Sequence, residues 1–310
     1  MLNQKLEVRA QPDLGDDMPY LLAASLLWAF SFGLIGNALK DVDPFVIAWI
    51  RLFLSLLIFL PFCRPRRFPL ALHGWLLLIG AVQYGLMYMA YIASFRFLAS
   101  HEVALLTVFT PLYVAAAHDL ARGRFHWLHL CTALAALAAT GGIVYRGGEY
   151  GWAWRGFLLV QASNVCFALG QVGYARVMAK FGRSISGQER IRDDVALFAL
   201  LYLGALLAAT LPAARVALTD GLSLARHEML ALIYLGLVPS GIGFFLWNVG
   251  ARRVDGGTLA VMNNAKIPLA VLVSLWVFRE DAQPLRLVAG ALVIALCVIL
   301  NRLQSQRFAL

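Results

Sequence analysis

The sequence has few charged residues and no long hydrophilic segment, and this scarcity already decides the class of protein. Only 14% of its 310 residues are charged, whereas 61% are hydrophobic, and the mean hydropathy is +0.74. A water-soluble chain of this length could not cover so much apolar surface with polar side chains. The composition therefore excludes a soluble globular protein and predicts one that is embedded in lipid.

Cysteine is also scarce, and the common catalytic motifs are missing. No glycine-rich phosphate loop, HExxH motif or GxSxG motif is present. The four cysteines lie within or at the ends of apolar segments and have no paired spacing, which argues against disulfides and zinc. We therefore expect no enzyme activity, no metal and no cofactor. The cysteines are Cys63, Cys131, Cys166 and Cys297.

Ten apolar segments follow one another along the chain, and each is long enough for one transmembrane helix. About 20 helical residues cross the roughly 30 Å of hydrocarbon, and the segments lack the alternation of barrel strands. The fold class that follows is an all-α integral membrane protein with ten transmembrane helices. The expected spans are residues 19–39, 44–63, 72–95, 102–121, 126–146, 154–179, 194–213, 228–250, 257–278 and 284–302.

The net charge of +9 is spread over short loops rather than gathered on one basic face. This distribution indicates a lipid bilayer, and no nucleic acid, as the partner. With the N-terminus in the cytoplasm, most Lys and Arg residues fall on the cytoplasmic side, as the positive-inside rule requires. We expect a bacterial-type inner membrane, with cytoplasmic tails at residues 1–18 and 303–310.

Two segments that contain a proline resemble each other and indicate an internal duplication. They are TPLYVAAAHDLARGR from Thr110 and IPLAVLVSLWVFRED from Ile267, aligned on Pro111 and Pro268. Because each half has five helices, the second half must enter the membrane with the opposite orientation. The expected halves are residues 19–146 and 154–302, joined by a periplasmic or extracellular linker at 147–153.

Three parts of the chain together resemble a known family. They are LWAFSFGLIGNALKDVDPFVIAWIRLFLSLLIFLPF from Leu27, the two proline segments, and FREDAQPLRLVAGALVIALCVIL from Phe278. They are similar to the EamA family of the drug/metabolite transporter superfamily over essentially the whole chain. The resemblance implies a ten-helix inverted-repeat carrier for amino acids or related metabolites, often an exporter, with aromatic amino-acid exporters among its members.

The resemblance also indicates individual residues. A basic residue in the second helix, here Arg51, and an acidic residue near the ends of the fourth and ninth helices, here Glu280, recur in the family pattern. The first half departs from this pattern, because Gly123 occupies the position aligned with the acid.

Lys266 is the strongest single indication of a binding site. It lies near the centre of the ninth apolar segment, where a charge costs several kcal/mol unless it is paired or faces water. Asn263 precedes it by one turn, and Pro268 frees the carbonyl of Asn264 inside the bundle. We predict a cation that faces a cavity and binds a substrate carboxylate. The alternative is a structural lysine that caps helix ends or pairs with an acid.

Further polar and aromatic residues form a second set of candidates for substrate binding. Arg51 could hold a carboxylate in bidentate fashion, although a structural role within the helix packing is favoured. Tyr84, Tyr88 and Tyr91 share one helix face that either lines a wet cavity or packs in the core. The remaining candidates either bind substrate or join helices: Gln161, Asn164, Asn248 and Trp28.

Several prolines and glycines are candidates for hinges. A helix that bends at equivalent places in both halves suits gating, although close helix packing would also explain the glycines. The candidates are Pro111, Pro268, Pro239, Gly241 and Gly243.

The charges lead to a functional hypothesis. The mid-membrane charges are Lys266 and Arg51, while every carboxylate lies in a loop or near a helix end. We therefore expect a transporter of a small metabolite with an anionic group, most simply an amino acid. It would work by alternating access, as an exporter that uses facilitated diffusion or exchange, and as a monomer or homodimer. An intramembrane lipid-modifying enzyme and a proton-coupled drug or metabolite exporter are the alternatives.

Overall fold

The computed structural model describes residues 14–121, 123, 150–181, 187–252, 254 and 256–280. Every regular element in these ranges is helical. The α-helices are α1 (Leu14–Gly33), α2 (Pro44–Phe59), α3 (Leu70–Gly80), α4 (Met87–Ser94), α5 (Ser100–Leu106), α6 (Thr110–Ala121), α8 (Tyr150–Phe181), α9 (Gly187–Thr219), α10 (Arg226–Leu235), α11 (Phe244–Ala251) and α12 (Gly256–Trp276). Short π-helical segments are η1 (Leu34–Ala38), η4 (Ala81–Leu86) and η6 (Gly236–Gly243), and short 3-10 segments are η2 (Leu60–Phe62), η3 (Pro65–Arg67) and η5 (Thr107–Phe109).

Within the described ranges, seven stretches of helix are long and apolar enough to cross a membrane. They confirm the predicted all-α membrane class, and they coincide in place with the first four expected spans and with the sixth to eighth. Helix α12 coincides with the ninth. The fifth and tenth expected spans lie outside the described residues, so the ten-helix inverted repeat stays a prediction. The stretches are Pro19–Ala38, Pro44–Phe62, Leu70–Ser94, Ser100–Ala121, Ala153–Phe181, Ile191–Thr219 and Arg226–Ala251.

The helices form a bundle whose outer surface is apolar. Along α9, Leu207, Leu211 and Leu218 are 62%, 80% and 87% exposed, whereas Tyr202 and Ala205 on the same helix are fully buried. Water would penalise such an exposed leucine stripe, but hydrocarbon does not. The outward face of α9 is therefore a lipid-facing surface.

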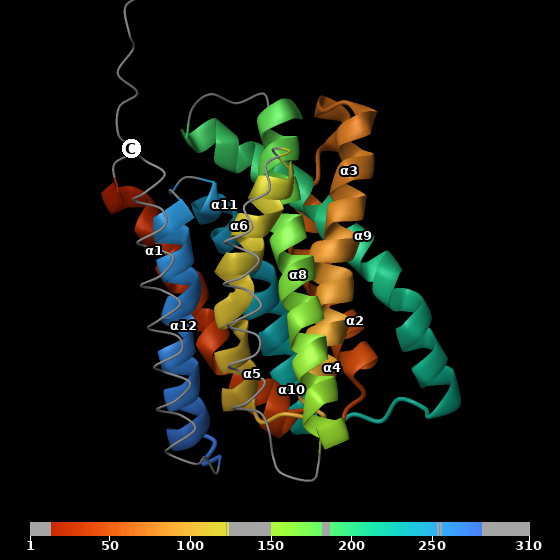
Figure 1. Ribbon diagram of the computed structural model, residues 1–310. Helices are drawn as coiled ribbons and strands as arrows, with labels where there is room; N and C mark the ends of the chain where they lie inside the picture. Colours follow the sequence, from red (N-terminus) through yellow and green to blue (C-terminus); the bar gives the residue numbers. More distant parts are fainter. Residues whose placement is uncertain are drawn as a thin grey trace, which may run out of the picture.

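Neighbouring helices surround a common centre. Helix α1 packs against α12 and α11, α2 packs against α9 and η6, and α8 packs against α4 and α6. Figure 1 shows α1 and α12 side by side at one edge of the bundle, and α3 with α9 at the other. Segments far apart in the sequence thus meet around the same interior, and this arrangement positions the site.

Helices α3 and α9 approach each other so closely that two glycines are required. A Cβ atom added at Gly80 would lie 1.9 Å from the carbonyl oxygen of Leu201, and one at Gly204 would lie 2.0 Å from that of Leu77. Both obstacles are backbone atoms, which cannot rotate away as a side chain can. Small residues at such contacts let membrane helices pack by dispersion forces over a large area. Close packing of α3 against α9 therefore explains why residue 80 is a glycine.

The π-helical segment η6 interrupts the eighth predicted helix at Pro239, and other helices bind the interrupted backbone. The Trp28 indole N–H donates to the Pro239 carbonyl at 3.0 Å, and the Ser55 hydroxyl donates to the Gly236 carbonyl at 2.8 Å. The Tyr202 hydroxyl donates to the Ser240 carbonyl. Proline and π-bulges leave helix carbonyls without a partner, and inside a membrane these must be satisfied by neighbours. The third predicted helix is also interrupted by a π-helical segment, η4, which contains no proline.

Gly80→Ala should destabilise the protein, because its Cβ would push α3 and α9 apart. Overpacking of this kind costs about 1–3 kcal/mol, so we expect a lower melting temperature in detergent. Gly74→Ala on the same helix is the matched control, since nothing lies within 4 Å of its added Cβ. Equal melting temperatures for the two variants would contradict the close-packing interpretation.

Candidate substrate-binding cavity

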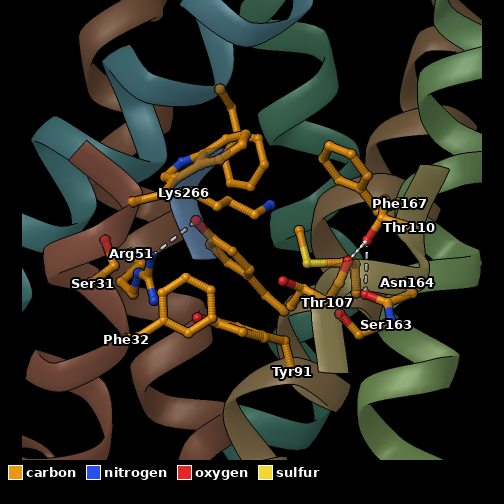
Figure 2. A pocket seen from close by; sticks show the side chains of 14 residues that line it. Ser31, Phe32, Arg51, Tyr91, Thr107, Thr110, Ser163, Asn164, Phe167 and Lys266 are labelled. Atoms are coloured by element: carbon orange, nitrogen blue, oxygen red, sulfur yellow. Dashed lines mark hydrogen bonds between the residues drawn. The ribbon is translucent and has the colours of Figure 1, made fainter. Parts of the chain in front are cut away.

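A cavity lies at the centre of the bundle and holds about 530 Å³ of space free of protein atoms, open solvent at its mouth included. Its lining combines aromatic rings with a few polar and charged side chains, as small-molecule sites commonly do. Both sequence halves contribute to its lining, as Figure 2 shows. The lining residues are Trp28, Ser31, Phe32, Arg51, Met87, Tyr88, Tyr91, Thr107, Thr110, Ser163, Asn164, Phe167, Phe244 and Lys266.

Lys266 reaches this cavity from α12, and its side chain is buried. Its ammonium nitrogen lies 3.3 Å from the Asn263 side-chain oxygen, 4.8 Å from the centre of the Trp28 ring and 6.0 Å from that of Trp247. Amide oxygens and indole faces stabilise a cation without neutralising it. Within the described ranges no carboxylate forms an ion pair with Lys266. Its positive charge is therefore available to a ligand.

Arg51 is the second cation of the cavity, and its side chain is held in place. Its Nε donates to the Ser240 hydroxyl and its Nη2 donates to the Tyr88 hydroxyl, both at 3.0 Å. The guanidinium carbon lies 4.4 Å from the centre of the Tyr88 ring. Its Nη1 is buried and has no hydrogen-bond partner among the residues described. Arg51 thus presents a rigid charge with one unused donor group.

Aromatic rings make up much of the remaining wall. Trp28 packs against Phe244 and Trp247 with ring centres 4.8 Å and 5.1 Å apart, and Phe32 meets Tyr91 edge-on at 5.8 Å. Rings arranged in this way offer a rigid apolar surface to the body of a ligand.

The part of the wall formed by α6 and α8 is polar but uncharged. Asn164 donates from Nδ2 to the Leu106 carbonyl at 3.0 Å and to the Gln161 side-chain oxygen at 3.2 Å. The Thr110 hydroxyl lies 3.1 Å from the Asn164 side-chain oxygen. Leu106 is the N-cap of the 3-10 segment η5, so Asn164 ties α8 to the start of this segment. Gln161 does not line the cavity but holds Asn164 in place.

The structure brings most of the predicted binding residues together at this cavity. Six of them line it, and Asn263 and Gln161 contact lining residues. Tyr84 and Asn248 lie elsewhere, hydrogen-bonded to each other in the core. The six are Trp28, Arg51, Tyr88, Tyr91, Asn164 and Lys266.

Tyr84 lies one turn before Tyr88, and the rings of both contact Phe244, with ring centres 5.0 Å and 5.6 Å away. Tyr88 and Tyr91 line the cavity, whereas the ring of Tyr84 packs against Tyr202, 5.3 Å away, in the core. The cavity therefore ends within this row of tyrosines.

Three polar residues of the lining are not among those predicted from the sequence: Thr107, Thr110 and Ser163. A signal for two of them existed, because Thr107 and Thr110 are three positions apart and share one face of an otherwise apolar segment. The structure also locates the predicted hinge residues, whose role as hinges stays a prediction. Pro111 is the second residue of α6, Pro268 lies within α12, and Pro239 with Gly241 and Gly243 lies in η6.

Two carboxylates are bound at helix ends, one just beyond the last residue of α12 and one near the start of α9, and these two helix ends lie at opposite ends of the bundle (Figure 1). Beyond the end of α12, Glu280 accepts from the Asn37 amide at 2.8 Å and lies 2.8 Å from Nδ1 of His101. At the other end, Asp194 pairs with Arg252 and accepts from the Tyr174 hydroxyl at 2.6 Å. These interactions join helix ends and keep both acids away from Lys266.

Glu280 is ionised in this setting. Burial alone would raise its pKa, but the hydrogen bonds from His101, Asn37 and the backbone outweigh it and lower the pKa to about 2. A carboxylate held so firmly has a structural role, joining α12 to η1 and α5.

Comparison with known proteins places the chain in a family. A model of the EamA-like transporter family matches residues 18–145 and 154–302. The chain belongs to this family, and thereby to the drug/metabolite transporter superfamily. Its apolar helices and this membership make it a multi-pass membrane transporter.

Three transporters of this kind are similar to the chain, two of them over nearly its whole length. A probable biotin transporter of Pseudomonas aeruginosa is 39% identical over 291 residues, covering 92% of this chain and 98% of the relative. A biotin transporter of Salmonella typhimurium is 37% identical over 288 residues, covering 92% and 93%. A probable terminal-alkyne amino-acid exporter of Streptantibioticus cattleyicolor is 37% identical over 70 residues only, 23% and 24% of the two chains. One crystal structure has the same fold, with a TM-score of 0.62, 19% identity and coverage of 95% and 99%.

Glu280→Gln should lower the melting temperature at neutral pH, because the amide cannot replace an ionised acceptor. A depressed pKa contributes stability that is present above the unfolded value and is lost as pH falls toward about 2. The difference in melting temperature between the wild type and Glu280→Gln should therefore become smaller below about pH 4.3, the ordinary pKa of Glu. A difference in melting temperature that is constant with pH would show that the charge of Glu280 does not contribute to stability.

Proposed function

We propose that this EamA-like transporter carries biotin, or a closely similar monocarboxylate, across the bacterial inner membrane. The observation that carries the proposal is the pair of buried cations, Lys266 and Arg51, facing one cavity. The similarity of nearly the whole chain to proteins named biotin transporters supports the choice of substrate.

The described residues that line this cavity include two cations but no carboxylate. A cation buried away from water is costly unless an opposite charge or strong hydrogen bonds compensate it. Lys266 has a single amide oxygen and two indole faces as partners. We assign the carboxylate of the substrate to the Lys266 ammonium, with the unused Nη1 of Arg51 adding to the positive field. The aromatic wall would contact the apolar ring and chain.

Amino acids are the second candidate, as the sequence resemblance suggested, and the short similarity to an amino-acid exporter supports them. A zwitterion would bring its own ammonium beside two cations, and the described lining contains no carboxylate to receive it. A net anion has no such conflict, so we favour biotin.

For the transport cycle we propose alternating access between two inverted five-helix halves, with both termini cytoplasmic. The two segments matched by the family model, residues 18–145 and 154–302, lie close to the predicted halves and support this division. The described lining offers no acid that could carry a coupled proton. Facilitated diffusion or exchange is therefore our choice, and the substrate gradient then sets the direction, export included.

Counterflow in proteoliposomes tests the proposal. Vesicles preloaded with unlabelled biotin should accumulate labelled biotin from outside, and protein-free vesicles should not. Counterflow of phenylalanine without counterflow of biotin would support the second candidate and overturn the first.

Lys266→Met should reduce biotin binding about 10- to 100-fold, the loss expected for a hydrogen bond to a charged group. Its melting temperature should stay near that of the wild type, because methionine fills a similar volume. Lys180→Met, at the exposed end of α8, is the matched control and should transport normally. If Lys266→Met fails to fold, or folds and transports normally, the lysine is not the substrate's anchor.

A further inference from the structure

We infer that the cavity has a second subsite that binds an uncharged N–H- and C=O-bearing head group of the ureido or cyclic amide class. The subsite is the polar wall formed by Thr107, Thr110, Ser163 and Asn164. The inference rests on the proposed function, because it assigns the other end of the same substrate.

The polar wall is separate from the two cations. Thr107 belongs to η5, Thr110 begins α6, and Ser163 with Asn164 comes from α8. Figure 2 shows these residues together on one side of the cavity, with Lys266 and Arg51 on the other. All four are buried, and none carries a charge. A ligand that spans the cavity therefore meets a positive end and a neutral polar end.

Most hydrogen atoms of the polar wall are already used within the protein. The Thr107 hydroxyl donates to the Ala104 carbonyl at 2.7 Å, and the Thr110 hydroxyl lies 2.8 Å from the Thr107 carbonyl and 3.1 Å from the Asn164 side-chain oxygen. Both hydrogens of the Asn164 amide have protein acceptors. Hydroxyl and amide oxygens each have two lone pairs, so these three side chains can still accept. This part of the wall recognises N–H groups.

Ser163 supplies a hydrogen-bond donor, which the other three residues of the polar wall do not have free. Its hydroxyl lines the cavity, its side chain is 4% exposed, and it makes no hydrogen bond within the described part of the chain. It can therefore donate to a ligand carbonyl. Its oxygen is not among the fully enclosed polar atoms that lack a partner, so it remains accessible from the cavity.

A ureido group fits this pattern of donors and acceptors. Its N–H groups match the oxygens of Asn164 and the two threonines, and its carbonyl oxygen matches the Ser163 hydroxyl. A carboxylate at the same wall would face mostly lone pairs, so the acid end of the substrate is directed to Lys266. The two subsites fix the orientation of the ligand and reject acids that lack N–H groups, because buried acceptors would then stay unpaired.

Competition against labelled biotin in the counterflow assay tests the subsite. Dethiobiotin keeps the ureido group and the acid but lacks the sulfur ring, and it should compete within about 10-fold of biotin, since one apolar contact is lost. Lipoate keeps a sulfur ring and the pentanoate chain but has no N–H group, and it should compete at least about 100-fold more weakly, as expected for several unpaired polar groups. Equal competition by lipoate would overturn the subsite and leave biotin transport standing, whereas absence of biotin counterflow would overturn both.

Two variants locate the effect. Ser163→Ala should weaken biotin binding about 5-fold, as for one neutral hydrogen bond, and should leave inhibition by lipoate unchanged. Thr110→Val, which keeps the shape but removes the oxygen, should act in the same direction. The matched control is Ser274→Ala, since Ser274 is fully buried and outside the cavity lining. A parallel loss for biotin and lipoate, or no loss in either variant, would overturn the assignment.

Discussion

The site depends on a positive charge that is buried in a membrane protein and has no acid beside it among the described residues. Lys266 is kept in a water-poor interior by an amide oxygen and two indole rings. These partners hold the charge without cancelling it. The acids that could have cancelled it, Glu280 and Asp194, are bound at the helix ends. The positive character of the cavity thus results as much from where the carboxylates are held as from where the lysine lies.

The scaffold around this charge combines rigid and interrupted helices. Helices α3 and α9 meet backbone to backbone at Gly80 and Gly204, which leaves no room for sliding. In contrast, η4 and η6 interrupt the ladders of their helices, and side chains from other helices take the carbonyls released in η6. Interruption within a membrane is tolerated only where such partners exist. The cavity lies beside these interrupted segments, and Arg51 is bound to one of them through Ser240.

Hydropathy and charge in the sequence were sufficient to predict the class, the positions of most helices and the place of Lys266 at a cavity. The position of Tyr84 was not predictable in this way, because Tyr84 and Tyr88 are one turn apart and only the assembled helices show that the cavity ends between them. Thr107, Thr110 and Ser163 were missed for another reason. Hydroxyls in apolar helices usually bond to their own carbonyls, so only the assembled cavity distinguishes those that face a ligand. The contact between Gly80 and Leu201 likewise depends on two helices more than a hundred residues apart in sequence.

Trp28 contacts both parts of this system. Its ring faces the Lys266 ammonium, and its indole N–H holds the Pro239 carbonyl in the interrupted helix. If Lys266 moves toward a bound anion, the surroundings of the Trp28 ring change, and the same ring is hydrogen-bonded to η6. Indole emission responds to nearby charge and to hydrogen bonding, so in a variant that lacks the other seven tryptophans Trp28 can report occupancy and helix geometry without an attached dye.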